Sequence, residues 1–301
     1  MRKIGIEGGR RVALASLAAV AGTGFASGRE LTAFFAQLGR CAWLSAVVAS
    51  AFFGLATGLL CQWARRCRAA SPDEAARELG PAARRAVLAL HRLLLALAAA
   101  AMLAGAARMG ALALPMRLGW LWGILAALLA ALLVNLGKLR ALPWLGALAF
   151  AAGVIWYTAL ALDPSPTRIF LPGETVLALE DSVPAAVALG LLYGAMNACV
   201  AAPAALRFSR GASRPLRAGA LSGGMLFAVL AAALAALKRG GRTLLAQAMP
   251  EVLLAARWGL AGFWLCAGFA FFCACCTLSA ALAGLLPSSR PRGMLNVINR
   301  P

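Results

Sequence analysis

AVAGTGFASGRE, residues 19–30, occupies the middle of the first long apolar segment of the chain. Glycine in a helix interior costs about 1 kcal/mol relative to alanine. Gly22, Gly24 and Gly28 fall near the centre of this segment, where a membrane-spanning helix would lie deepest in the bilayer. Non-helical backbone at that depth is tolerated only where protein buries it or where it lines a cavity. The stretch therefore predicts a break in the first helix, and secondary transporters use such breaks to bind substrate and ion.

The composition is that of a membrane protein. Of the 301 residues, 62% are hydrophobic and 13% are charged, whereas an ordinary soluble domain has about 25% charged residues. The mean hydropathy is +0.83. A membrane-spanning helix needs about 20 apolar residues, and we expect eight spans, at 11–38, 42–64, 86–113, 118–137, 141–162, 184–208, 216–237 and 258–286. The sequence predicts an all-α integral membrane protein with a single transmembrane domain over residues 1–301.

The net charge of +19 predicts an orientation in the membrane. Most Lys and Arg residues fall in segments that share one side of the membrane, and cytoplasmic loops are the ones enriched in these residues. We therefore expect a cytoplasmic amino terminus, with the lipid bilayer rather than nucleic acid as the partner of the positive charge. The connection between the seventh and eighth spans is an exception, because Lys238, Arg239, Arg242 and Arg257 fall on the other side.

Arg29 and Glu30 follow the glycines directly and still lie inside the hydrocarbon depth, about 7 to 9 Å past the centre of the span at 1.5 Å per residue. Charged residues at such a depth are costly and indicate function by default. Neighbouring residues on a helix do not face one another, so each charge should have its own partner. Two other readings stay open for the glycines: close helix packing through Gly24-x-x-x-Gly28, and, less well supported, a dinucleotide-binding loop.

The sixth span, 184–208, carries a similar pattern in the opposite orientation. It contains Gly190, Tyr193, Gly194, Asn197 and Pro203. Paired interruptions in two halves of a chain point to a transporter site, so we expect a second interrupted helix here. The alternative is that Asn197 only hydrogen-bonds a neighbouring helix.

Two connections between spans should hold short helices. In the loop after the second span, Ser71 and Pro72 form a helix start, and a solvated linker helix is favoured there over a gate. Between the seventh and eighth spans, the apolar pieces on either side of Pro250 predict two short helices across the outer face, which could act as a lid.

At these residues the chain resembles the YkvI-type membrane proteins, a bacterial family related to the amino acid, polyamine and organocation transporters. Residues 22–30, GTGFASGRE, are close to the G-A-G-F-A-S-G-Q-E signature of that family, and Tyr193 with Asn197 is similar to its Tyr-x-x-x-Asn in the sixth helix. The resemblance implies a LeuT-type inverted-repeat bundle with broken helices 1 and 6 in the cytoplasmic membrane of a bacterium. It also implies a solute site at Gly22, Thr23, Gly24, Phe25, Ser27, Gly28, Arg29, Glu30, Tyr193 and Asn197.

The same resemblance implies ion coupling and a repeat structure. Na⁺ or H⁺ is the expected coupling ion, with Thr277 and Ser279 as candidate sodium ligands. The first repeat would cover residues 11–162 and an incomplete second repeat residues 184–286. The family plan has ten helices, so we expect that the last two are missing through truncation, frameshift or divergence. Arg29 stands where the family has Gln, which places a cation beside the break.

The expected function is secondary transport of a small amino-acid-like solute by alternating access. The alternatives are a non-transporting sensor or assembly protein with the same fold, and a truncated inactive relative. We expect no enzyme and no bound organic cofactor, because the chain has one histidine, His91, and lacks a His-Glu-x-x-His motif. The C-x-x-C motif within CACC, residues 273–276, has no His or acidic residue nearby, which favours helix packing over metal binding or redox chemistry.

Overall fold

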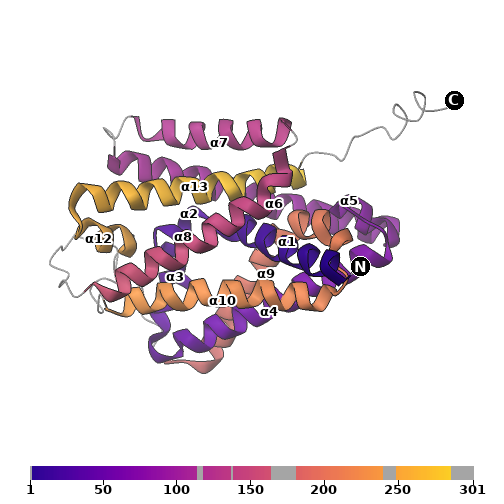
Figure 1. Ribbon diagram of the computed structural model, residues 1–301, viewed down its shortest axis with the longest axis horizontal. Helices are drawn as coiled ribbons and strands as arrows, with labels where there is room; N and C mark the ends of the chain where they lie inside the picture. Colours follow the sequence, from indigo (N-terminus) through magenta and orange to yellow (C-terminus); the bar gives the residue numbers. More distant parts are fainter. Residues whose placement is uncertain (1, 114–117, 137, 164–180, 240–248, 286–301) are drawn as a thin grey trace.

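The computed structural model describes residues 2–113, 118–136, 138–163, 181–239 and 249–285. Within these ranges the chain is almost entirely helical and contains no strand. The long helices lie side by side in an elongated bundle (Figure 1). They are α1 (Arg2–Val20), α4 (Ala42–Arg66), α6 (Pro81–Ala113), α7 (Trp120–Asn135), α8 (Leu142–Leu162), α9 (Val183–Phe208), α10 (Pro215–Arg239) and α13 (Gly259–Leu285).

Within the described residues, six helical segments are long and apolar enough to cross a membrane: Ala36–Arg66, Pro81–Leu112, Leu139–Leu162, Val183–Gly211, Pro215–Arg239 and Gly259–Leu285. Large apolar side chains stand exposed on their outer faces, among them Trp144, Ile155 and Leu260, which are 79%, 69% and 73% exposed. Apolar patches of this kind mark contact with a partner or a membrane. The structure therefore supports a multi-pass membrane protein.

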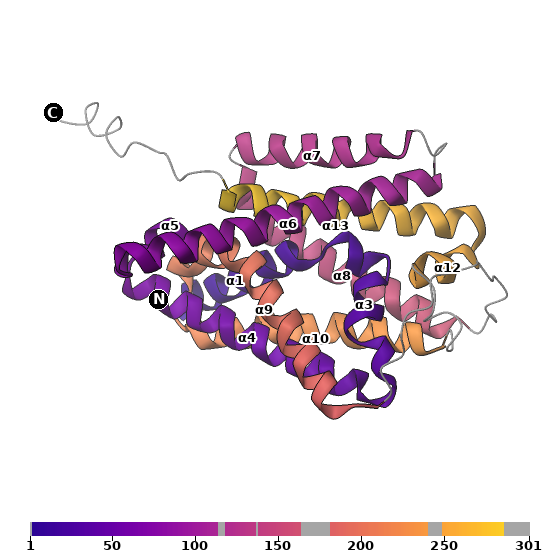
Figure 2. The ribbon, with the colours of Figure 1, turned by 180° about the vertical axis from the view of Figure 1, so that it is seen from behind.

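The other two predicted spans differ from the expectation. The fourth corresponds to α7, which has only 16 residues and packs at the edge of the bundle against α6 and α13 (Figures 1 and 2). The first is divided among α1, α2 (Thr23–Ala26), α3 (Arg29–Phe34) and a 3-10 segment η1 (Ala36–Cys41). This division contains the predicted break, and α1 starts well before residue 11.

The short helix in the loop after α4 is confirmed. It comprises α5 (Pro72–Ala75) and a 3-10 turn η2 (Ala76–Glu78). The Ser71 hydroxyl accepts a hydrogen bond from the Glu74 amide at 3.3 Å, and the Glu74 carboxylate accepts one from the Ala70 amide at 2.8 Å. The side chains of Ser71 and Glu74 thus satisfy amides at the start of the helix, as in a capping box.

The prediction of an interruption in the sixth span is wrong, because α9 is one continuous helix from Val183 to Phe208. Its glycines serve helix packing instead. A Cβ at Gly190 would lie 2.6 Å from the Ser45 carbonyl oxygen of α4, and a Cβ at Gly194 would lie 2.7 Å from that of Ala49. Glycines spaced four residues apart let two helices approach closely, and here they bring α9 onto α4.

Pro203 lies inside α9 without breaking it. Proline has no amide hydrogen, so it leaves the carbonyl of the residue four positions earlier, Cys199, without its helical partner. His91 of α6 replaces that partner, since its Nε2 lies 3.1 Å from the Cys199 carbonyl oxygen. The only histidine in the chain therefore compensates for a proline in a neighbouring helix.

Candidate functional site

The first span is interrupted at two places. Residues 21 and 22 separate α1 from α2, and Ser27 and Gly28 separate α2 from α3; residues 21–28 are called the break from here on. Gly28 has φ +79°, a left-handed conformation that costs glycine little and strains other residues. The backbone can therefore turn at this point, and α3 starts directly after it.

Glu30 of α3 folds back over the break. Its carboxyl group lies directly against the backbone of Gly24, where a Cβ atom would overlap with it. A Cβ at Gly22 would lie 2.8 Å from the sulfur of Met102 in α6. The two glycines therefore leave room for the side chains of Met102 and Glu30, and neither glycine has a positive φ.

Tyr193 and Asn197 of α9 also lie near the Glu30 carboxyl group, which contacts Gly24. Tyr193 is fully buried and its ring contacts those of Phe34 and Phe35, with centroids 5.1 and 4.9 Å away. Its hydroxyl group is next to the Glu30 carboxyl and the Asn197 amide. Asn197 donates a hydrogen bond of 2.9 Å to the Tyr193 carbonyl oxygen.

The structure thus brings together five of the predicted site residues: Gly22, Gly24, Glu30, Tyr193 and Asn197. Phe25 and Ser27 are buried in the break itself, and the Ser27 hydroxyl donates to the Gly24 carbonyl oxygen at 3.3 Å. Arg29, by contrast, is exposed, whereas Glu30 is half-buried, so the two adjacent charges have separate surroundings. The side chain of Thr23 lies outside the described part of the structure.

Thr277 and Ser279, the candidate sodium ligands, are both buried in α13. The Ser279 hydroxyl donates to the Cys275 carbonyl oxygen at 2.7 Å. The Thr277 hydroxyl has no hydrogen-bond partner among the described residues, so its oxygen lone pairs are unused. Among the residues that the structure describes, no group of three or more His, Cys, Asp or Glu side chains could hold a metal ion.

A second carboxyl group at the break was missed by the sequence analysis. Glu251 lies in the short helix α12 (Pro250–Ala256), at the opposite end of the bundle from the amino terminus (Figure 1). It is fully buried, and its side chain packs against Gly28. The first of the two short helices expected in this connection falls largely on residues outside the described ranges.

Tyr157 of α8 connects Glu251 to the break. Its hydroxyl lies 2.9 Å from Oε2 of Glu251 and 3.0 Å from the Phe25 carbonyl oxygen. Oε1 of Glu251 has no hydrogen-bond partner among the described residues. The one sequence signal for this group was an acidic residue directly after Pro250, at the start of a helix in an otherwise apolar stretch.

Burial raises the pKa of Glu251 well above its ordinary value of 4.5. The loss of solvation disfavours the charged carboxylate, and no Lys or Arg forms an ion pair with it among the described residues. The neighbouring titratable groups are Tyr157, Cys266 and Cys273, none of which is a cation. The surroundings therefore favour a neutral, protonated Glu251.

Comparison with models of protein families, with curated proteins and with solved structures gave no match.

Proposed function

We propose that this chain is a secondary transporter that moves a small amino-acid-like solute across a membrane by alternating access. The observation that supports the proposal most directly is the position of Glu30, whose carboxyl group lies against Gly24 within the interrupted first predicted span. Ionisable groups at membrane depth are costly and usually functional. Interrupted helices are the usual place for solute and ion sites in secondary transporters.

The chemistry of the site suits a cationic group. The Glu30 carboxylate would accept hydrogen bonds from the ammonium group of the solute, while the Tyr193 hydroxyl and the Asn197 amide offer polar contacts beside it. Since the carboxyl group now fills the space next to Gly24, a solute must displace it. Glu30 would then move between a self-occupied state and a solute-bound state.

Coupling to an ion belongs to the same proposal. The unused lone pairs of the buried Thr277 hydroxyl are oxygen ligands for Na⁺, and Glu30 is a group that can carry H⁺. We further propose that the amino terminus is cytoplasmic and that the membrane is the bacterial cytoplasmic membrane. Arg65 and Arg66 at the end of α4 and Arg217 at the start of α10 lie at the end of the bundle where the chain begins, which agrees with the positive-inside rule. Lys238 and Arg239 at the other end of α10 are the exception.

A thermal-shift screen of the purified chain against amino acids and their amines, with and without Na⁺, tests this function. We expect one solute class to raise the melting temperature of the wild type and not that of Glu30→Gln. Arg40→Gln is the control, because it removes a charge from an exposed position of the same segment that lies outside the expected site, and it should keep the response. Gly24→Leu should also abolish solute binding while the protein still inserts into the membrane. An unchanged response in both Glu30→Gln and Gly24→Leu would contradict this site.

The tight contact between Glu30 and Gly24 favours a second candidate function, a non-transporting sensor or assembly protein. In that case the glycines serve packing, and the carboxyl group never leaves its place. No solute in a broad panel would then shift the melting temperature, and Gly24→Leu would disrupt a complex with a partner protein instead.

A further inference from the structure

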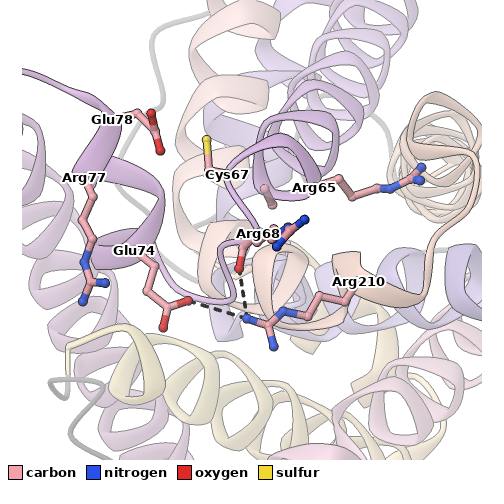
Figure 3. Close-up of a pocket in the computed structure, with 8 residues that line it drawn as sticks. Arg65, Cys67, Arg68, Glu74, Arg77, Glu78 and Arg210 are labelled. Atoms are coloured by element: carbon pink, nitrogen blue, oxygen red, sulfur yellow. Dashed lines mark hydrogen bonds and ion pairs between the residues drawn. The ribbon is translucent and has the colours of Figure 1, made fainter. Parts of the chain in front are cut away.

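Arginines at the end of α4 and around the start of α10 form a basic surface at the end of the bundle where the chain begins. One hollow of about 670 Å³ in this surface contains its own counter-ions (Figure 3). The Arg210 guanidinium lies 3.9 Å from the Glu74 carboxylate and donates a 3.0 Å hydrogen bond to the Arg68 carbonyl oxygen. Glu78 also lines this hollow. Its charge is therefore partly neutralised within the protein.

The neighbouring hollow differs in charge. Arg65 belongs to both hollows and extends away from the Arg210–Glu74 pair (Figure 3). The second hollow has a volume of about 570 Å³, and among the residues whose side chains the structure describes no acidic one lines it. Its basic lining consists of Arg65, Arg66, Arg214 and Arg217. None of these four forms an ion pair within the described part of the chain, and Arg65 is fixed by a 2.7 Å hydrogen bond to the Ser213 carbonyl oxygen.

An apolar groove starts where the arginines end. Leu216 lines both the second hollow and a groove of about 560 Å³ between α4 and α10. The groove continues past Gly54, Gly223 and Gly224 to Phe227. Gly54 and Gly223 bring the two helices into backbone contact, and the open space around the Cβ position of Gly224 hollows the outer face.

The length of this groove matches one leaflet of a bilayer. From Leu216 to Phe227 the helix rises about 17 Å at 1.5 Å per residue, and half of the hydrocarbon core is about 15 Å. The groove thus runs from the arginines at the helix ends toward the middle of the membrane. Val47 and Leu55 of α4 line it and are about half exposed, as expected for a lipid-facing surface.

We propose that the arginine hollow and the apolar groove form one binding site for an anionic phospholipid. Guanidinium groups bind phosphate through paired hydrogen bonds, and basic pockets between membrane helices bind anionic headgroups. One acyl chain lies along α10 in the groove while the phosphate meets Arg65, Arg214 and Arg217. This inference goes beyond the proposed transport function and does not depend on it.

Native mass spectrometry of the purified full chain tests the site. The wild type should retain phosphatidylglycerol in preference to phosphatidylcholine with the same acyl chains. Each arginine near a membrane surface contributes about 1 kcal/mol toward anionic lipid, so the double variant R214Q/R217Q should bind phosphatidylglycerol about 30-fold more weakly. R84Q/R85Q on α6 is the matched control, because it removes the same charge from residues that line neither hollow.

The groove is tested separately with Gly224→Leu. A side chain there meets open space, so the variant should fold, fill the groove and weaken phosphatidylglycerol binding. Gly268→Leu on α13 is its control, since position 268 is equally open and lies outside the groove. Inorganic phosphate serves as the headgroup without a chain and should displace the lipid only at far higher concentration.

Several results would overturn the proposal. Equal retention of the two lipids by the wild type would exclude a headgroup site without reference to any variant. If R84Q/R85Q weakened phosphatidylglycerol binding as much as R214Q/R217Q, the preference for this lipid would come from the general positive charge of the surface and not from a site. Unchanged lipid binding in Gly224→Leu would remove the acyl-chain site, and displacement by phosphate at matched concentration would identify a site for a free anion instead.

Discussion

The hydroxyl of Tyr157 lies 2.9 Å from Oε2 of Glu251, although 94 residues separate the two in the chain. The same hydroxyl lies 3.0 Å from the Phe25 carbonyl oxygen. A hydroxyl has one proton to donate, so both contacts are hydrogen bonds only when Glu251 carries a proton and donates it to Tyr157. The geometry thus favours a protonated Glu251, as its burial does, and joins α12, α8 and the break in one network.

The stability of the protein should fall with rising pH because of Glu251. Its pKa is raised in the folded protein, so above 4.5 the folded state keeps a proton that the unfolded chain has released. The free energy of unfolding then decreases by up to about 1.4 kcal/mol per pH unit until the raised pKa is reached. In Glu251→Gln the side chain keeps nearly the same shape but has no group that titrates. Its melting temperature in detergent should vary less with pH than that of the wild type.

The Tyr157 network provides the control for this prediction. Tyr157→Phe leaves Glu251 titratable but removes its hydrogen-bond partner, which costs about 1–3 kcal/mol for a buried polar group. It should lower the melting temperature at every pH and keep the slope. A Glu251→Gln variant with the pH slope of the wild type would show that other groups dominate the titration.

Substitution of Gly24 by alanine should destabilise the protein, whereas the same change at Gly268 should not. A Cβ at Gly24 overlaps with the Glu30 carboxyl, while a Cβ at Gly268 meets open space. Alanine in an open helical position is favoured over glycine by about 1 kcal/mol, so Gly268→Ala should be neutral or stabilising. The melting temperatures of Gly24→Ala and Gly268→Ala, each compared with that of the wild type, test this difference between the two positions.

The contact with Glu30 predicts a rescue. In the Glu30→Ala background the space beside Gly24 is empty, so Gly24→Ala should lose most of its cost. A cost of Gly24→Ala that is independent of residue 30 would mean that the backbone of the break, and not the carboxyl group, requires glycine at this position.

His91 should matter only because α9 contains a proline. His91→Ala leaves the Cys199 carbonyl oxygen without a donor, which costs about 1–3 kcal/mol where the group is shielded from water. Pro203→Ala restores the amide that would donate to this carbonyl group. The cost of His91→Ala should therefore be smaller in the Pro203→Ala background, and a double-mutant cycle measures the difference. If His91→Ala lowered the stability equally in the wild type and in Pro203→Ala, the role of His91 would be unrelated to Pro203.

Features that depend on local sequence were predicted correctly. The interruption near Gly22 and Gly24 follows from the intrinsic cost of glycine in a helix, and the helix start at Ser71 follows from side-chain capping; both act within a few residues. The six long apolar segments follow from length and hydropathy alone. None of these features requires knowledge of a neighbouring helix.

Features that depend on distant partners were not predictable in the same way. Gly190 and Gly194 look in sequence like the glycines of the break, but α4 lies against them and makes them packing positions in an unbroken helix. Glu251 is inconspicuous in the sequence because its partner Tyr157 is on another helix. Glu30 lies beside Tyr193, and both belong to the expected site, but the overlap of the Glu30 carboxyl group with the position of a Gly24 Cβ could not be read from residue types.

The helix α2 has four residues with a non-helical joint on each side, and its carbonyl groups are contacted by other helices. The Phe25 carbonyl oxygen is 3.0 Å from the Tyr157 hydroxyl of α8, and the Ala26 carbonyl oxygen is 3.7 Å from the Cys266 sulfur of α13. This single turn is thus held by side chains of α8 and α13 as well as by its chain connections to α1 and α3. A shift between those two helices would therefore change the shape of the interrupted segment, and with it the place where Glu30 rests, without bending any long helix.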